Sequence, residues 1–407
     1  MSPATESILM ETMKGRAMEA GMRYFRKFRT KSFASVLLLL GVCGLSSCQP
    51  ESSVKVPQTW QQRLPGLLVE SGLEAGDPWA MAHLHLAFPE NESLESQRVQ
   101  LKELLIDSQS VIPIHGHDGE RGEQHPHLLL RTAVVLSGPE ISASLIERVR
   151  SDLQKTKSPE SWKEVNDLAW LLDAVARSSL NRESEAKGIP LAELISRVFA
   201  ELEAADRSIT AIVEQDPAGE VRRPSGLAGP TEAGIWAYTC SGAHLLGALV
   251  ECDLAGLLTP AEEVRLMGLL QQFELRLVWE INYRKAELKR AIAGGVSPRR
   301  AVREYGLALT KLLGHGLEIM TRATLLEARS GSSEAVESFS AVADFLVEEI
   351  QDLFSSRDVL QSGEVFDPGA VLRSQAVSIE SPVWERSFGD LCHLFRGLRL
   401  HKSPGSY

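Results

Sequence analysis

Long hydrophobic runs, aromatic residues and familiar catalytic motifs are all scarce in this chain of 407 residues. Aromatic residues make up only 6% of it. Neither a Walker A sequence nor a Rossmann glycine pattern is present, and there is no His-Glu-x-x-His or Gly-x-Ser-x-Gly sequence. These absences disfavour the common nucleotide-driven enzymes and the common hydrolases.

Strand patterns are almost absent as well. Alternating β-branched runs bounded by turn residues do not recur, whereas apolar residues at a helical period of 3.6 do. One such series runs through Ile195, Val198, Phe199 and Leu202. The sequence therefore predicts an all-α protein.

The longest apolar run, Phe33–Leu45, follows five Lys or Arg residues between positions 23 and 31. This run covers 13 residues, whereas spanning a bilayer takes roughly 20 apolar residues, so a membrane-spanning helix is the less favoured alternative. A basic segment before a short apolar run is typical of a secretory signal peptide. Translation could start at Met13 or Met22 rather than at the first residue.

The sequence Leu-Ser-Ser-Cys at residues 45–48 resembles the lipobox of bacterial lipoprotein precursors. By this resemblance, residues 1–47 are removed, and Cys48 becomes the first residue and the lipid attachment site, with palmitate as an expected acyl group. Residues 48–58 would be a tether, and 59–400 a single all-α domain. The protein would be extracytoplasmic and anchored to a membrane. Gln49 favours the outer membrane over the cytoplasmic one.

Charge and cysteine count describe the part beyond the signal peptide. The whole chain carries −11 and residues 1–47 contribute +4, so the remainder carries −15. So acidic a body argues against nucleic acid as a partner. Its cysteines are Cys240, Cys252 and Cys392, an odd number that allows at most one disulfide.

Two kinds of predicted helix alternate along the body. Amphipathic, highly charged helices are predicted over residues 59–73, 93–109, 140–156, 191–214, 260–293 and 332–356. More uniformly apolar helices, which would be buried, are predicted over 78–88, 126–137, 162–179, 241–258, 314–329 and 383–398. This alternation predicts an (α/α) toroid of about six helical hairpins. An irregular helical bundle is the alternative.

Polar residues at or near the predicted starts of the apolar helices are the candidate pocket residues. They are His83, His125, Asn166, Asp167, His244 and His315. In a toroid, the starts of all inner helices meet at one mouth, so these side chains could converge. Neutral imidazoles there could bind a metal or act as general bases. The alternative is that each histidine is a lone core or capping residue.

Cys240 and His244 are the candidate metal ligands. Residues four apart on a helix share one face, so this pair could supply two zinc ligands, with His315 or His125 as a third. The pair could also act as nucleophile and base. A small buried cysteine at a close-packed helix start is the third interpretation.

The segment Gly314-His315-Gly316-Leu317-Glu318 resembles the Gly-His-x-x-Glu element of the acylglucosamine and cellobiose 2-epimerase group, over residues 314–327. That resemblance implies an (α/α)6 toroid in which His315 is a catalytic acid or base on a sugar and Glu318 orients it. It also implies a second histidine near the C-terminus, for which His393 is the candidate.

Two functions remain open from the sequence. The first is a binding or scaffold lipoprotein, whose partner would be a small molecule or an envelope protein. The second is a carbohydrate-active or zinc-dependent toroid enzyme that uses His315 as acid/base or metal ligand.

Overall fold

The fold is described from a computed structural model, and all statements below concern the residues it describes. These are 59–75, 78–96, 98–99, 127–178, 180, 185–186, 189–216, 234–330, 333–355, 364, 366–373 and 382–403. Cys48, His125 and most of the helix predicted over 93–109 lie outside them.

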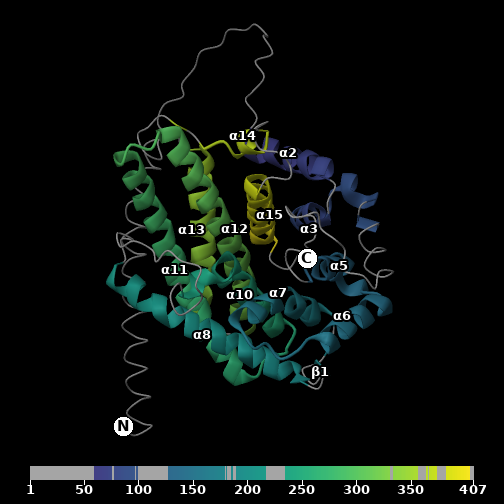
Figure 1. The fold of residues 1–407 in the computed structure, drawn as a ribbon. Coiled ribbons are helices and arrows are strands. Elements are labelled where there is room, and N and C mark those ends of the chain that lie inside the picture. The colour runs from purple at the N-terminus through teal and green to yellow at the C-terminus, as the bar shows by residue number, and fades with distance from the viewer. Residues whose placement is uncertain are drawn as a thin grey trace, which may run out of the picture. The chain divides into compact units, whose positions relative to one another are not determined.

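The described part of the chain is helical apart from two paired strands of two residues each (Figure 1). In chain order the elements are α2 (Trp60–Ala75), α3 (Pro78–Ala87), η1 (Glu92–Leu94), α5 (Leu128–Ser137), η2 (Gly138–Glu140), α6 (Ala143–Lys155), α7 (Trp162–Arg177), β1 (Glu185–Ala186), β2 (Ile189–Pro190), α8 (Leu191–Gln215), η3 (Gly234–Ala237), η4 (Thr239–Gly242), α10 (Ala243–Leu254), α11 (Pro260–Ala293), α12 (Pro298–Ser330), α13 (Ser333–Ser355), α14 (Pro368–Leu372) and α15 (Pro382–Lys402). The prediction of an all-α body is confirmed.

Local sequence explains where several helices begin. Ser161 and Glu164 form a capping box at the start of α7, and Thr259 and Glu262 form another at the start of α11. In each box the side chains bond backbone N–H groups that the helix itself leaves unpaired. Pro260, the first residue of α11, needs no such partner because it has no N–H group.

The apolar helices pack on one another in a closed cycle. α3 contacts α5, α5 contacts α7, α7 contacts α10, α10 contacts α12, α12 contacts α15, and α15 returns to α3. These six are the helices predicted to be buried. The charged helices α2, α6, α8, α11 and α13 each contact at least one of them.

One boundary differs from the prediction in a way that matters for the site. The helix predicted to begin near residue 314 begins at Pro298, so His315 lies at the middle of α12. The charged stretch 285–303 is helical except for residues 294–297, which separate α11 from α12. A helix with a solvated face tolerates such a run of charges.

α12 and α15 approach each other closely, and glycine makes this approach possible. A Cβ atom added to Gly314 would lie 2.7 Å from the backbone nitrogen of Leu394. The backbone of α15 therefore occupies the space that any other residue at position 314 would need. This contact sets His315 and Glu318 of α12 beside His393 and the rest of α15.

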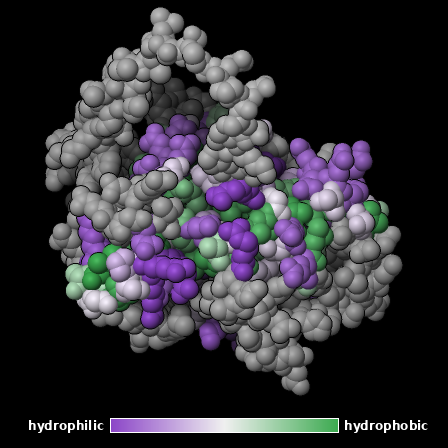
Figure 2. Space-filling model, turned by 90° about the horizontal axis from the view of Figure 1, so that it is seen from above, coloured by the Kyte–Doolittle hydropathy of each residue, from purple (hydrophilic) through white to green (hydrophobic). Residues whose placement is uncertain are grey.

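Large hydrophobic side chains are mostly inside the molecule. Among the described residues, Val99 and Val264 are the large hydrophobic ones that are well exposed. Figure 2 shows hydrophilic and hydrophobic residues interleaved on one face. No described helix is both long and apolar enough to span a membrane.

The close approach of α12 and α15 gives a stability prediction. Gly314→Ala should lower the free energy of unfolding by roughly 1–3 kcal/mol, because the added methyl group forces the two helices apart. Gly268→Ala is the control, since nothing lies within 4 Å of its added Cβ in α11. That change should raise stability by roughly 0.5–1 kcal/mol. Urea unfolding followed by circular dichroism measures the free energy of unfolding of both variants. A Gly314→Ala variant as stable as the wild type would contradict the described contact.

Candidate functional site

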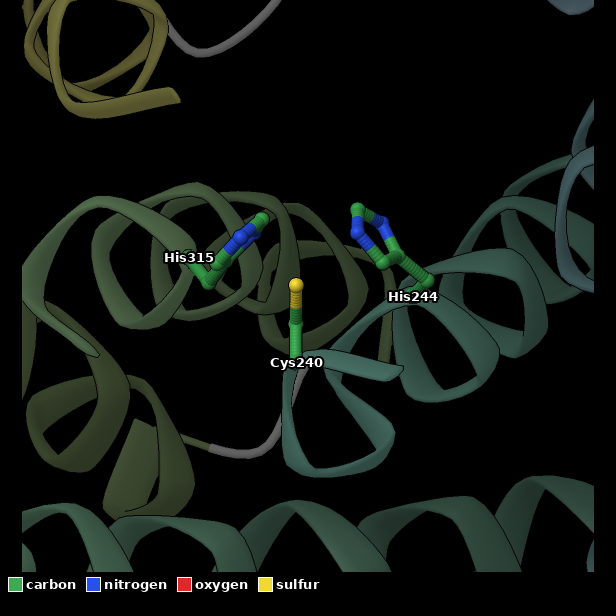
Figure 3. A group of neighbouring side chains, drawn as sticks. All are labelled: Cys240, His244 and His315. Carbon is green, nitrogen blue, oxygen red and sulfur yellow. The ribbon is translucent and has the colours of Figure 1, made fainter. Parts of the chain in front are cut away.

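Cys240, His244 and His315 come together from η4, the start of α10 and the middle of α12. One donor atom from each lies within 4.8 Å of the other two. Figure 3 shows the Cys240 sulfur pointing into the space between the two imidazole rings. A thiol and two imidazoles are ligands that zinc accepts.

The way Cys240 reaches this position differs from the prediction. Cys240 and His244 were expected to share one helix face, but α10 begins only at Ala243. Cys240, Ser241 and Gly242 instead form a left-handed turn, with φ values of 50°, 56° and 75°. This conformation costs roughly 1–2 kcal/mol for each residue other than glycine.

Tertiary contacts stabilise this unfavourable turn. The Arg276 side chain donates to the Ser241 carbonyl oxygen at 2.9 Å, and it also pairs with Asp206 at 3.1 Å. Strained backbone that is held in this way is found most often at functional sites. Here the turn aims the Cys240 thiol at the two histidines.

His315 has an unused ring nitrogen. The side chain is 4% exposed, and its Nε2 atom has no hydrogen-bond partner. Burial, followed by the charge of His393 when protonated, lowers the pKa of His315 well below its ordinary value, so the ring is neutral at neutral pH. Since buried polar atoms are nearly always hydrogen-bonded, this nitrogen is a candidate position for a bound water or metal ion.

Cys240 is a protonated thiol in the absence of a metal. Burial raises its pKa to about 11, although nearby Lys311 opposes the shift. A thiol of this kind is a poor free nucleophile. A bound metal would remove its proton, so the metal interpretation of Cys240 fits these surroundings better than the nucleophile interpretation.

A second group shares His315 with the first. His393 Nδ1 lies 2.9 Å from Glu318 Oε1, and the rings of His315 and His393 are 3.9 Å apart. His315, Glu318 and His393 also satisfy the distance condition for a metal site. The ring centre of His83 lies 5.3 Å from that of His393, and His83 donates from Nδ1 to the Trp79 carbonyl oxygen.

A cavity of about 40 Å³ adjoins both groups. His244, His315 and Glu318 line it, together with residues of α5, α7 and α15. His244 lies at the start of α10, as expected, but His315 is a mid-helix residue of α12 and meets His393 of α15 because these two helices pack closely.

Not every predicted pocket residue reaches this cavity. His83, Asn166 and Asp167 do not line it; Asp167 is exposed and bonds to Asn166. Asp173, nearly two turns further along α7, lines the cavity instead. His125 lies outside the described residues.

Sequence reasoning missed most of the charged residues in the cavity wall. These are Arg131, Asp173, Glu251 and Arg396, each of them buried. A signal was available, because each is a charged residue within a helix predicted to be buried. A charge in such a helix needs a partner inside the protein.

No protein family model, no curated protein and no solved structure matches this chain. The chemistry of the site is therefore argued from the residues described above. Their donor types, distances and burial define the class to which the site belongs, a candidate transition-metal centre next to a charged cavity.

Proposed function

We propose that this protein binds one zinc ion through Cys240, His244 and His315, and that this metal centre is its functional site. The observation that carries the proposal is the buried, unpartnered Nε2 atom of His315 in a group whose donor atoms lie within 4.8 Å of one another. Tetrahedral zinc sets its ligand atoms about 3.5 Å apart, given bonds of about 2.0–2.3 Å. Small side-chain rotations would bring the donor atoms from within 4.8 Å to this shorter separation.

The fourth coordination position would face the cavity, because His244 and His315 both line it. Three protein ligands with one open position are typical of zinc sites that bind water or substrate, whereas structural sites use four. Zinc at such a site supplies a Lewis acid and lowers the pKa of bound water.

A metal-dependent hydrolase or transferase is therefore the second candidate function. One observation favours it: the hydrogen bond of 2.9 Å between His393 Nδ1 and Glu318 Oε1, next to His315. A carboxylate that binds one imidazole nitrogen orients the ring and makes its other nitrogen more basic. His393, held by Glu318, would act as the general base in such a reaction.

The epimerase alternative receives less support from the site. Pockets for small organic ligands usually measure roughly 300–1,000 Å³, and this cavity measures about 40 Å³. His315 and His393 also lie against each other, with ring centres 3.9 Å apart. A sugar ring does not fit between them in this arrangement.

The (α/α) toroid is part of the same proposal. The closed cycle of contacts from α3 through α5, α7, α10, α12 and α15 supports these helices as an inner ring. The charged helices would then form the outer ring. The metal centre would lie inside the ring, where α10, α12 and α15 meet.

The metal centre would act outside the cytoplasm. The lipobox-like sequence at residues 45–48 supports a lipid on Cys48, followed by a short tether that ends near residue 58. The partners of the protein would then be the membrane, through its lipid, and a ligand about the size of water or a small ion at the open zinc position.

Metal content tests the zinc proposal. The full chain, purified in detergent without chelators, should contain about one zinc per chain by mass spectrometry. Cys240→Ser combined with His244→Ala should bring this content close to zero, because only one protein ligand remains.

Matched controls keep the zinc test specific. Cys252→Ser and His401→Ala change a buried cysteine and a partly exposed histidine outside the two candidate metal groups, and both should retain the zinc. Wild-type protein that is folded but takes up no zinc, even when zinc is added, would overturn the proposal. It would leave a scaffold lipoprotein as the better account.

The lipid anchor has its own test. Cys48→Ala should abolish incorporation of a labelled palmitate analogue and move the protein from the membrane fraction to the soluble fraction. Cys43→Ala, which changes a cysteine that leaves with the signal peptide, should do neither. Membrane association that survives Cys48→Ala would contradict the lipoprotein assignment.

A further inference from the structure

The turn between α11 and α12 and the helix ends beside it form a strongly basic surface on an acidic protein. The two helices run side by side as a hairpin (Figure 1). Residues 284–304, here called the basic tip, contain seven Lys or Arg and two Glu, a formal charge of +5. The chain beyond residue 47 carries −15 as a whole. Positive charge is therefore gathered at this hairpin tip against the trend of the molecule.

Ion pairs within the protein use only part of this charge. Three pairs form, Arg284 with Glu287 at 2.7 Å, Lys285 with Glu349 at 2.7 Å, and Arg300 with Glu304 at 2.8 Å. Lys289, Arg299 and Arg303 are exposed, and none of them forms an ion pair with an acidic residue that the structure describes. Three cations of the basic tip thus face solvent and are available to a partner.

The position of the arginines in α12 does not favour helix stability. Arg299 and Arg300 lie in the first turn of α12, which contains no acidic residue. The start of a helix carries a partial positive charge, so cations there are destabilising and carboxylates are stabilising. The first turns of α7 and α11 follow this rule and contain acidic residues. Binding outside the molecule explains the two arginines better than folding does.

The chain enters its helical body at the same end as the basic tip. Trp60, the first residue of α2, has its ring centre 4.6 Å from that of Phe354 in the last turn of α13. Phe354 lies 5.9 Å from Phe366 by ring centres, and the Phe366 ring packs against Gly306 of α12. Arg299 is only about 10 Å from Gly306 along the helix. The end of any tether that precedes Trp60 is therefore close to the basic tip.

We propose that the basic tip lies on the anionic lipid surface of the membrane in which Cys48 is anchored. The choice of partner rests on the proposed lipid anchor. Residues 49–59 can span at most about 40 Å, so the anchor would keep this end of the body near the membrane. Lys and Arg are attracted to anionic lipid over about 8 Å at physiological salt. Ile292 and Val296, half-buried beside the turn, add a small apolar surface to this contact.

Lysine labelling on vesicles tests this surface. The full chain, purified in detergent, is reconstituted into vesicles of phosphatidylcholine, with or without about 30% phosphatidylglycerol as the anionic lipid. An amine-reactive reagent and mass spectrometry then report the accessibility of each lysine. Labelling of Lys289 should be roughly threefold lower or less on the anionic vesicles. About 1 M salt should restore it, because the screening length falls to about 3 Å. Lys157, an exposed lysine outside the basic tip, should be labelled equally throughout.

Matched charge reversals show whether the basic tip causes the protection. Arg299→Glu with Arg303→Glu should abolish the protection of Lys289. This variant should be at least as stable as the wild type, because a glutamate suits the start of α12. Lys163→Glu with Lys402→Glu makes the same change in net charge at exposed positions outside the basic tip, and it should keep the protection.

Two results would overturn the inference. One is equal labelling of Lys289 on neutral and anionic vesicles, which would leave an acidic protein as the better partner for the basic tip. The other is protection that survives Arg299→Glu with Arg303→Glu.

Flotation of the same vesicles separates this inference from the lipid anchor. A lipid-anchored chain floats with both kinds of vesicle at any salt concentration. Flotation with both kinds but no protection of Lys289 would refute the contact of the basic tip and leave the anchor standing. Flotation with anionic vesicles alone, lost in Arg299→Glu with Arg303→Glu, would refute the anchor and support the contact. A chain that floats with neither would overturn both.

Discussion

The close contact between α12 and α15 is the constraint on which the rest of the site depends. At Gly314 the backbone of α15 takes the place of a side chain. His315, the next residue of α12, and Glu318, one turn further along, then face His393 and Arg396 of α15. Gly314 is therefore needed for its lack of a side chain, which leaves room for the backbone of α15, rather than for its flexibility.

A second constraint acts from the opposite side of the site. The left-handed turn at Cys240 and Ser241 is unfavourable by itself, and the bond from Arg276 to the Ser241 carbonyl oxygen stabilises it. The turn and the helix pair are built from segments far apart in the sequence. Together they bring the Cys240 thiol to the imidazoles of His244 and His315, next to the charged cavity. Strain and buried charge both cost stability, so their coincidence at one place argues for function rather than for folding alone.

The sequence predicted the helices more accurately than it predicted how their packing brings the site residues together. Helical periodicity reports on each segment separately, which is why the buried and charged helices could be told apart. The candidates His244, His315 and Glu318 do share one cavity. The reason given for it, a gathering of helix starts, holds for His244 at the start of α10 but is wrong for His315, because α12 begins at Pro298. Asn166 was placed in the pocket and Asp173 was overlooked, since a helix's rotation about its axis depends on tertiary packing. The left-handed turn at Cys240 carries no sequence signal other than Gly242.

The central claim is that a thiolate and two imidazoles hold a metal beside a cavity lined by charged residues. Zinc K-edge X-ray absorption on the metal-bound full chain tests it most directly. The account predicts one sulfur at about 2.3 Å and nitrogen or oxygen neighbours at about 2.0–2.1 Å. A zinc coordination shell without sulfur would contradict the account, because Cys240 would then not be a ligand.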